Sequence, residues 1–305
     1  MKLNFKMNLV CVTILMSCTS VAAQTQPTRP HIVGIGQVEF YSTNLDATGN
    51  FYTTIFGSDG KPADTCLWSN VCQVTGCFHF HSFCSGQHLR LKDAPKPLSS
   101  ALLAEVVFAT DDVKAMKKYL KAEKLTIKDA GEQYVAVMDP EGHRIGFMPS
   151  SQSSTPPSSG GMRIIHAGFV VHDRAAEDQF YKDILGFHVY WHGGMKEGED
   201  NWVDMQVPDG TDWIEYMLKV PENASHKTLG VMNHIALGVP DIQAAKQQLI
   251  KNGWKGTEEP KIGRDGKWQL NLYDPDETRV ELMEFKPTKE PCCSPYTGPH
   301  PGPKQ

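Results

Sequence analysis

Histidine and glutamate residues stand inside short apolar runs in the second half of this 305-residue sequence. Glu215 lies in Trp-Ile-Glu-Tyr-Met, His234 precedes Ile-Ala-Leu, and Glu281 lies in Val-Glu-Leu-Met. Side chains of an extended strand alternate between its two faces, so each of these residues shares a face with apolar neighbours. Those neighbours are Trp213 and Met217 for Glu215, Met232 and Ala236 for His234, and Met283 and Phe285 for Glu281.

A buried carboxylate needs a partner, because taking its charge out of water costs several kcal/mol. A divalent cation explains two such glutamates facing histidines better than unpaired burial does. Imidazole and carboxylate oxygen suit Zn, Ni, Co, Mn and Fe(II), and all five remain open. An ion with free coordination positions could hold two adjacent oxygens of a small-molecule substrate and act as a Lewis acid.

Plainer interpretations exist for each residue alone. A single histidine on a strand is usually structural, Glu215 could lie at an exposed rim, and Glu281 could pair with Arg279 or Arg264. The other histidines are interpreted as surface or loop residues, among them His172, His188, His192 and His226.

The two halves of the sequence repeat one order of segments. Strand-like residues 38–41 precede a helical pattern over 45–52, and strand-like residues 169–171 precede one over 174–181. Later, each half has a strand running into an acid-capped helix and then a hairpin across an Asp-Pro turn, at Asp139 and at Asp274. The order predicts an α+β fold in which each half is a pair of βαβββ modules forming a curved mixed sheet.

Composition marks the boundaries between these halves. Residues 150–161 are rich in Ser, Pro and Gly and predict a linker between domains at 31–149 and 162–287. The Pro-rich tail 288–305 is expected to be extended and poorly ordered. The net charge of −5 and the absence of a basic cluster argue against a nucleic-acid partner. The active unit is expected to be a monomer, as a pseudo-dimer of its two domains, or a homodimer.

Residues 1–23 have the parts of a secretory signal peptide, with a basic start, a short apolar core and small residues before a cleavage site after Ala23. The alternative is a lipoprotein signal in which Cys18 is lipidated. Both predict a secreted or periplasmic protein, and no segment is long and apolar enough to predict a membrane span. In an oxidising compartment the remaining cysteines favour disulfides of undetermined connectivity: Cys66, Cys72, Cys77, Cys84, Cys292 and Cys293. A zinc cluster with His79 and His81 is the rival interpretation of the first four.

Four segments in order carry a family resemblance: Ile-His-Ala-Gly-Phe at 165–169, Phe-Tyr at 180–181 with Leu-Gly-Phe at 185–187, Asn-His-Ile-Ala-Leu at 233–237, and Asp-Pro at 274–275 before Val-Glu-Leu. The sequence resembles the vicinal-oxygen-chelate superfamily, which includes glyoxalase I and the extradiol dioxygenases. The resemblance implies metal ligands at His166, Glu215, His234 and Glu281.

The first half departs from this pattern. Counting from its own Phe-Tyr and Asp-Pro pairs, the four positions fall at Gln37, about Arg90, Glu105 and Gly146. Glycine offers no ligand and arginine repels a cation, so this half is interpreted as a degenerate partner without a metal. Some family members share a site between two domains, which would divide the four-residue set.

The resemblance and the ligand set favour an isomerase or lyase of the glyoxalase I type, in which Glu215 or Glu281 acts as the general base. The alternative is an Fe(II) extradiol dioxygenase, but the His and Tyr which that family places shortly before its last strand have no match here. A third interpretation is a non-catalytic protein that binds a small molecule beside its tryptophans, which are Trp191, Trp202, Trp213 and Trp268.

Overall fold

The structure is a computed structural model that describes residues 27–56, 65–73, 76–83, 86–96, 102–150 and 162–303, with only the backbone described over 65–83. The predicted signal peptide 1–23, the predicted linker apart from Ser150, Cys84, and the side chains of Cys66, Cys72, Cys77, His79 and His81 lie outside the described residues. No helix in the described part of the chain is long and apolar enough to cross a membrane.

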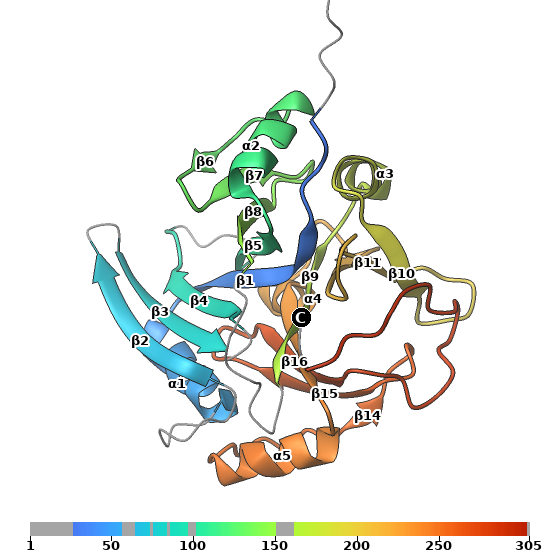
Figure 1. The fold of residues 1–305 in the computed structure, drawn as a ribbon. Helices are drawn as coiled ribbons and strands as arrows, with labels where there is room; N and C mark the ends of the chain where they lie inside the picture. Colours follow the sequence, from blue (N-terminus) through green and yellow to red (C-terminus); the bar gives the residue numbers. More distant parts are fainter. Residues whose placement is uncertain are drawn as a thin grey trace, which may run out of the picture.

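The first half of the chain forms one eight-stranded mixed sheet with two helices (Figure 1). Its elements are β1 (Ile32–Ser42), α1 (Leu45–Phe56), β2 (Thr65–Gln73), β3 (Gly76–Phe83), β4 (His88–Asp93), β5 (Leu103–Thr110), α2 (Val113–Ala122), β6 (Asp129–Ala130), β7 (Val135–Met138) and β8 (Arg144–Pro149). Strand order across this sheet is β2-β3-β4-β1-β5-β8-β7-β6.

The second half forms another eight-stranded sheet, with the order β10-β11-β12-β9-β13-β16-β15-β14. Its elements are β9 (Arg163–Val170), α3 (Arg174–Asp178), the π-helix η1 (Gln179–Ile184), β10 (His188–Gly193), β11 (Trp202–Gln206), β12 (Trp213–Met217), α4 (His226–Met232), β13 (His234–Val239), α5 (Ile242–Lys251), β14 (Lys261–Ile262), β15 (Trp268–Tyr273) and β16 (Arg279–Glu284). The two strand orders correspond position by position, so the predicted α+β fold of paired βαβββ modules is confirmed.

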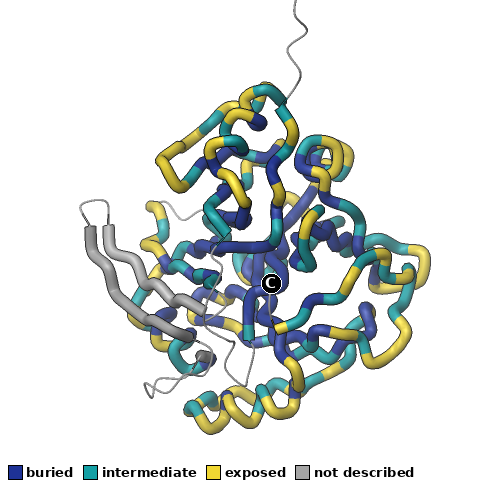
Figure 2. Tube along the Cα trace, in the orientation of Figure 1, coloured by how far each residue is buried: buried dark blue, intermediate teal, exposed yellow. Residues whose placement is uncertain are grey.

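The acid-capped helices form as their sequences predict. The carboxylate of Asp112 accepts a hydrogen bond from the backbone N–H of Ala115 at the start of α2, and Asp241 does the same for Ala244 at the start of α5. Each cap satisfies a backbone donor that the first helical turn leaves free. Buried residues follow the two sheets and the inner sides of the helices, while exposed residues gather on α5 and the outer turns (Figure 2).

The Asp-Pro turns join the two halves. Asp276 accepts a hydrogen bond from the backbone N–H of Thr43, at 3.1 Å, just before α1. In the same way Glu141 accepts from the backbone N–H of Asp173, at 2.5 Å, just before α3. The backbone N–H of Glu141 in turn donates to Glu177 Oε1 at 3.0 Å. Burial, and next the nearby Asp139 carboxylate, raise the pKa of Glu177 to about 9.

The Pro-rich tail is fixed to the second half, so the expectation that it is poorly ordered is wrong. The Tyr296 hydroxyl donates to the carbonyl of Asp265 at 2.7 Å, and the Tyr296 ring lies 4.7 Å from the Tyr190 ring. Arg163 Nε donates to the carbonyl of Gly302 at 2.7 Å, and Cys292 is disulfide-bonded to Cys293. The composition correctly predicts a tail whose described residues, 288–303, contain no helix or strand, but its aromatic rings and carbonyls have specific partners that composition does not reveal.

Candidate metal centre

Strand register brings the four predicted ligands to one face of the second sheet. On β9, His166 pairs with Trp213 of β12 on one side and with Ala236 of β13 on the other. Two residues further along β9, Gly168 pairs with Glu215 of β12 and with His234 of β13. Glu281 on β16 lies opposite Ala236 on β13. Side chains that alternate along adjacent strands at this register point to the same side of the sheet. The face that carries His166, Glu215, His234 and Glu281 is called the C-terminal cup below.

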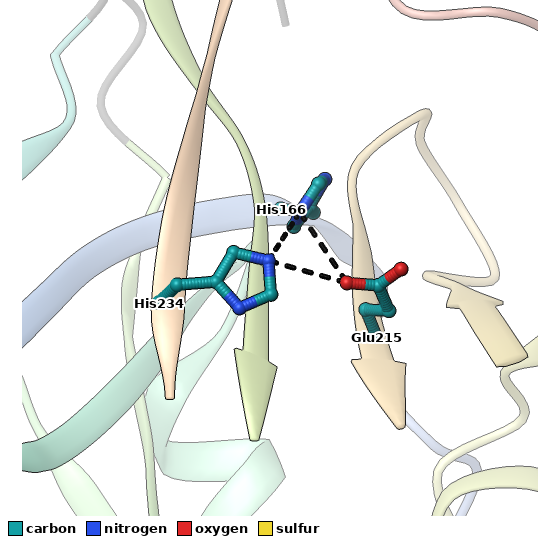
Figure 3. Close-up of side chains that lie close together, drawn as sticks. All are labelled: His166, Glu215 and His234. Carbon is teal, nitrogen blue, oxygen red and sulfur yellow. Dashed lines mark hydrogen bonds and ion pairs between the residues drawn. The ribbon is translucent and has the colours of Figure 1, made fainter. Parts of the chain in front are cut away.

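Three of the four predicted ligands in the C-terminal cup, His166, Glu215 and His234, point toward one another (Figure 3). His166 Nε2 is 3.1 Å from His234 Nε2, and Glu215 Oε2 is 3.2 Å from His234 Nε2 and 3.9 Å from His166 Nε2. Glu281 Oε2 is 3.8 Å from His166 Nε2 and 3.9 Å from His234 Nε2. Ligands about 2.0–2.2 Å from one metal ion lie roughly 3–4 Å from each other, so these spacings fit a shared ion. The tightest group is His166, Glu215 and His234.

Burial sets the protonation of these groups. It lowers the pKa of His166 and of His234 well below the usual range, so both imidazoles stay neutral and keep a lone pair for a metal. Burial also raises the pKa of Glu215 and of Glu281 to about 7, against the lowering effect of the nearby Arg279 guanidinium. A metal ion bound here would displace protons from both carboxyls, so its affinity rises with pH through this range.

The surroundings of His234 orient its ring. The carbonyl of Met232 lies 3.1 Å from His234 Nδ1 and can accept its proton, which leaves Nε2 as the ligand atom. Arg279 Nη2 lies 2.6 Å from the same Nε2, 3.0 Å from Nδ1 and 3.9 Å from Glu215 Oε2, so the guanidinium would have to move aside for an ion to bind at Nε2. Arg279 therefore contacts His234 and Glu215 at the site, and it is not the ion-pair partner of Glu281 that the plainer interpretation proposes.

Gly168 gives His234 its space. A β-carbon at Gly168 would collide with the His234 imidazole. The Gly168→Ala variant is therefore expected to turn this ring and to weaken metal binding by about tenfold or more, comparable to the loss of a residue that orients a ligand. Metal affinity measured by competition with a chromophoric chelator tests this. Gly131→Ala is the matched control, because a β-carbon there meets no atom within 4 Å; equal affinity in both variants would contradict the steric argument.

A cavity of about 330 Å³ opens beside the predicted ligands. Its walls combine aromatic rings, including Trp191, Trp202 and Trp213, with the cations Arg264 and Arg279. Two of the histidines interpreted as surface or loop residues form ion pairs outside the ligand set. His192 pairs with Asp200 at 2.7 Å, and His172 pairs with Glu141 at 3.1 Å. The cavity is large enough for a small oxygenated molecule next to the cluster.

Sequence reasoning missed two buried charged residues beside the cup. Asp204 lies opposite Glu215 on β11, and burial, followed by the Glu215 carboxylate, raises its pKa. Lys267 is fully buried with its Nζ atom 4.4 Å from the centre of the Trp213 ring. Asp204 could have been found, because it stands on a strand next to Val203 and Met205 as Glu215 stands between Ile214 and Tyr216. Lys267 has no comparable signal, since it precedes its strand.

The matching positions of the first half are those found by counting. Gln37 pairs with His88 and Val107, Arg90 with Glu39, and Gly146 with Val107, which reproduces the registers around His166, Glu215 and Glu281. These positions carry ion pairs instead. Arg144 Nε donates to Glu105 at 2.9 Å, and Arg90 Nη1 lies 3.2 Å from Glu39.

Comparisons with known proteins agree with this fold. Residues 163–282 match the model of the Glyoxalase/Bleomycin resistance protein/Dioxygenase superfamily. A comparison with curated proteins gives no match.

Among solved structures, a mutant of homoprotocatechuate 2,3-dioxygenase from Brevibacterium fuscum superposes with a TM-score of 0.61 at 18% identity, over 84% of this chain and 72% of that chain. The 2,3-dioxygenase LapB from Pseudomonas sp. KL28 superposes with a TM-score of 0.59 at 15% identity, over 90% of this chain and 96% of that chain. At these identities the likeness shows a shared fold. The resemblance to the vicinal-oxygen-chelate superfamily is thus confirmed for the second half, which matches the family model of the glyoxalases, bleomycin resistance proteins and dioxygenases, while the two halves together share the tandem fold of the two dioxygenase structures.

Proposed function

We propose that this protein is a metal-dependent enzyme acting on a small substrate that binds through two neighbouring oxygen atoms in the C-terminal cup. The observation that carries the proposal is that the two imidazole nitrogens lie 3.1 Å apart and that a carboxylate oxygen of Glu215 and one of Glu281 each lie 3.2–3.9 Å from both nitrogens. His166, His234, Glu281 and Glu215 would hold a divalent ion. That ion would supply Lewis-acid chemistry at the substrate oxygens.

The first candidate reaction is oxidative ring cleavage of a dihydroxylated aromatic. Its support is the two-domain plan shared with homoprotocatechuate 2,3-dioxygenase and with LapB. Two histidines and one carboxylate on one face are the ligand set of many non-haem Fe(II) oxygenases. Here His166, His234 and Glu281 supply that set. Trp191 and Trp202 supply an aromatic wall for a planar ring, and Arg279 and Arg264 supply cations for a negatively charged substituent.

The second candidate is a glyoxalase-like isomerase or lyase, which the second carboxylate favours. Glu215 Oε2 is closer to His234 Nε2, at 3.2 Å, than Glu281 Oε2 is, at 3.9 Å. A carboxyl with a pKa near 7 is suited to take and return a proton at neutral pH. In this reaction Glu215 would remove a proton next to the substrate carbonyl.

Glu215→Gln separates the two candidates. In the dioxygenase the variant keeps the three ligands His166, His234 and Glu281, so it should retain iron and lose activity by no more than about tenfold. In the isomerase the same variant removes the general base and should lower kcat by about 10²–10⁴-fold. The assays are elemental mass spectrometry of the protein after reconstitution with each metal, oxygen uptake with catechols, and isomerase turnover of α-oxoaldehyde adducts.

The wild-type protein decides whether either candidate holds. Stoichiometric iron with oxygen uptake supports ring cleavage, and nickel, cobalt or zinc with isomerase turnover supports the second candidate. A protein that binds no metal in the C-terminal cup after reconstitution would overturn both and leave a binding protein without catalysis.

A further inference from the structure

A second group of metal-type ligands lies where the two halves of the chain meet, outside the C-terminal cup. Asp139 and His143 come from the turn between β7 and β8 of the first half. Glu177 comes from α3 of the second half. The ligand atoms of these three residues all lie within 4.8 Å of one another.

The three side chains are held in place. Asp139 Oδ1 accepts from the backbone N–H of His143 at 2.7 Å, and Asp139 Oδ2 lies 2.7 Å from His143 Nδ1 and accepts from the Tyr181 hydroxyl at 3.1 Å. The His143 ring packs against Phe169 with ring centres 4.3 Å apart. Ligands fixed by such contacts need little rearrangement to bind an ion.

Glu177 has an unused oxygen at this point. Its Oε1 accepts the backbone N–H of Glu141, whereas its buried Oε2 receives no hydrogen bond from a donor among the described residues, and Glu177 can form a hydrogen bond with the nearby Asp139 carboxylate only through a proton held between them. The whole residue is 0% exposed. A carboxylate oxygen without a partner in such a place costs free energy unless a proton or a cation binds it.

The duplicated half shows that docking alone does not require these residues. The corresponding turn contains Asp274 and Thr278, and the backbone N–H of Thr278 donates to Asp274 at 2.9 Å as that of His143 does to Asp139. At the position of Glu177, α1 carries Thr48, whose hydroxyl donates to Asp276 at 3.0 Å. Threonines thus occupy both positions in the repeated turn, which docks on α1 without them offering an imidazole or a carboxylate, and the His/Glu pair adds metal-binding atoms on one side only.

We propose that Asp139, His143 and Glu177 bind a divalent transition-metal ion between the two halves. One imidazole and two carboxylates suit Zn²⁺ and Mn²⁺. The side chain of His143 is 20% exposed, which gives an ion a route from solvent. Because the ligands come from both halves, the ion would fix one half against the other.

Zn²⁺ stoichiometry tests the proposal in the mature full chain. In a His166→Ala/His234→Ala background, which disables the C-terminal cup, elemental analysis after zinc loading and gel filtration should give about one Zn²⁺ per chain. Adding Glu177→Gln, or His143→Thr copied from the repeated half, should remove it. Glu177→Gln is close to isosteric, and its amide can still accept from Glu141, so it should fold. Zn²⁺ should also raise the melting temperature of the background by about 5 °C or more and leave that of the Glu177→Gln variant unchanged.

The number of zinc ions bound per chain in each variant decides between the two sites. No zinc in the disabled-cup background, or zinc that persists after Glu177→Gln and after His143→Thr, overturns the interdomain site. The proposed enzyme fails separately: wild-type protein with one Zn²⁺ that disappears with Glu177→Gln but survives His166→Ala/His234→Ala would leave only the interdomain ion.

Discussion

The His234→Ala variant is expected to lose the metal ion of the C-terminal cup and with it the activity. His234 Nε2 is 3.1 Å from His166 Nε2 and 3.2 Å from Glu215 Oε2, so its removal leaves two carboxylates and one imidazole around a widened gap. Replacing a residue that only orients a ligand already costs 10–100-fold in metal affinity, so losing the ligand itself should cost at least about 100-fold. Isothermal titration with the reconstituting metal measures this, and turnover should fall in parallel.

Glu281→Gln is the companion variant, because it keeps the shape of the side chain and removes its charge. His192→Ala is the matched control, since His192 pairs with Asp200 and is 40% exposed in its side chain. Unchanged affinity in His234→Ala, or an equal loss in His192→Ala, would show that the metal binds elsewhere.

Arg163→Met is expected to lower the free energy of unfolding by about 3–5 kcal/mol, because it leaves the buried Asp212 without its cation. Both side chains are fully buried, and Arg163 Nη1 lies 2.5 Å from Asp212 Oδ1. Asp212 Oδ2 also accepts the backbone N–H of Ile35 at 2.9 Å, so this carboxylate links the second half to β1. Chemical denaturation of metal-free protein measures the change.

Arg174→Met provides the matched surface control. Arg174 pairs with Asp200 at 3.0 Å, but its side chain is 36% exposed and that of Asp200 is 37% exposed. An exposed pair of this kind contributes about 0–1 kcal/mol. Equal destabilisation by the two substitutions would mean that burial of Asp212 is not the cause.

Most of the fold and the ligand positions of the C-terminal cup could be predicted from the sequence, because strands have a regular alternation of side chains. The apolar runs around Glu215, His234 and Glu281 each fit one strand, and alternation fixes the face of every side chain once the strand is placed. The order of the repeated segments then fixes which strands are neighbours. For this reason, counting from the Asp-Pro pairs correctly identified Gly146 as the position in the first half that is equivalent to Glu281. In the structure, Gly146 pairs with Val107 between the parallel strands β8 and β5, as Glu281 pairs with Ala236 between β16 and β13.

Contacts between segments distant in sequence could not be predicted in the same way. His143 lies in a turn that reads as a plain hairpin, and only the docking of α3 brings Glu177 to it. The tail contains no periodic pattern, yet Tyr296 and the Gly302 carbonyl reach partners more than thirty residues away. The nearness of Arg279 to Glu281 in the sequence suggested an ion pair between them. In the structure, Arg279 on β16 instead contacts His234 on the neighbouring strand β13.

The bond between Cys292 and Cys293 reduces the number of ways in which the other cysteines can pair. Six cysteines follow residue 23, and six can pair completely in 15 ways. With the two neighbours joined to each other, only Cys66, Cys72, Cys77 and Cys84 remain, and four cysteines pair completely in 3 ways. Oxidative refolding of residues 24–305 therefore has few fully bridged products to choose among, and the tail cannot be covalently cross-linked to the first half or to a second chain while its own bridge is intact.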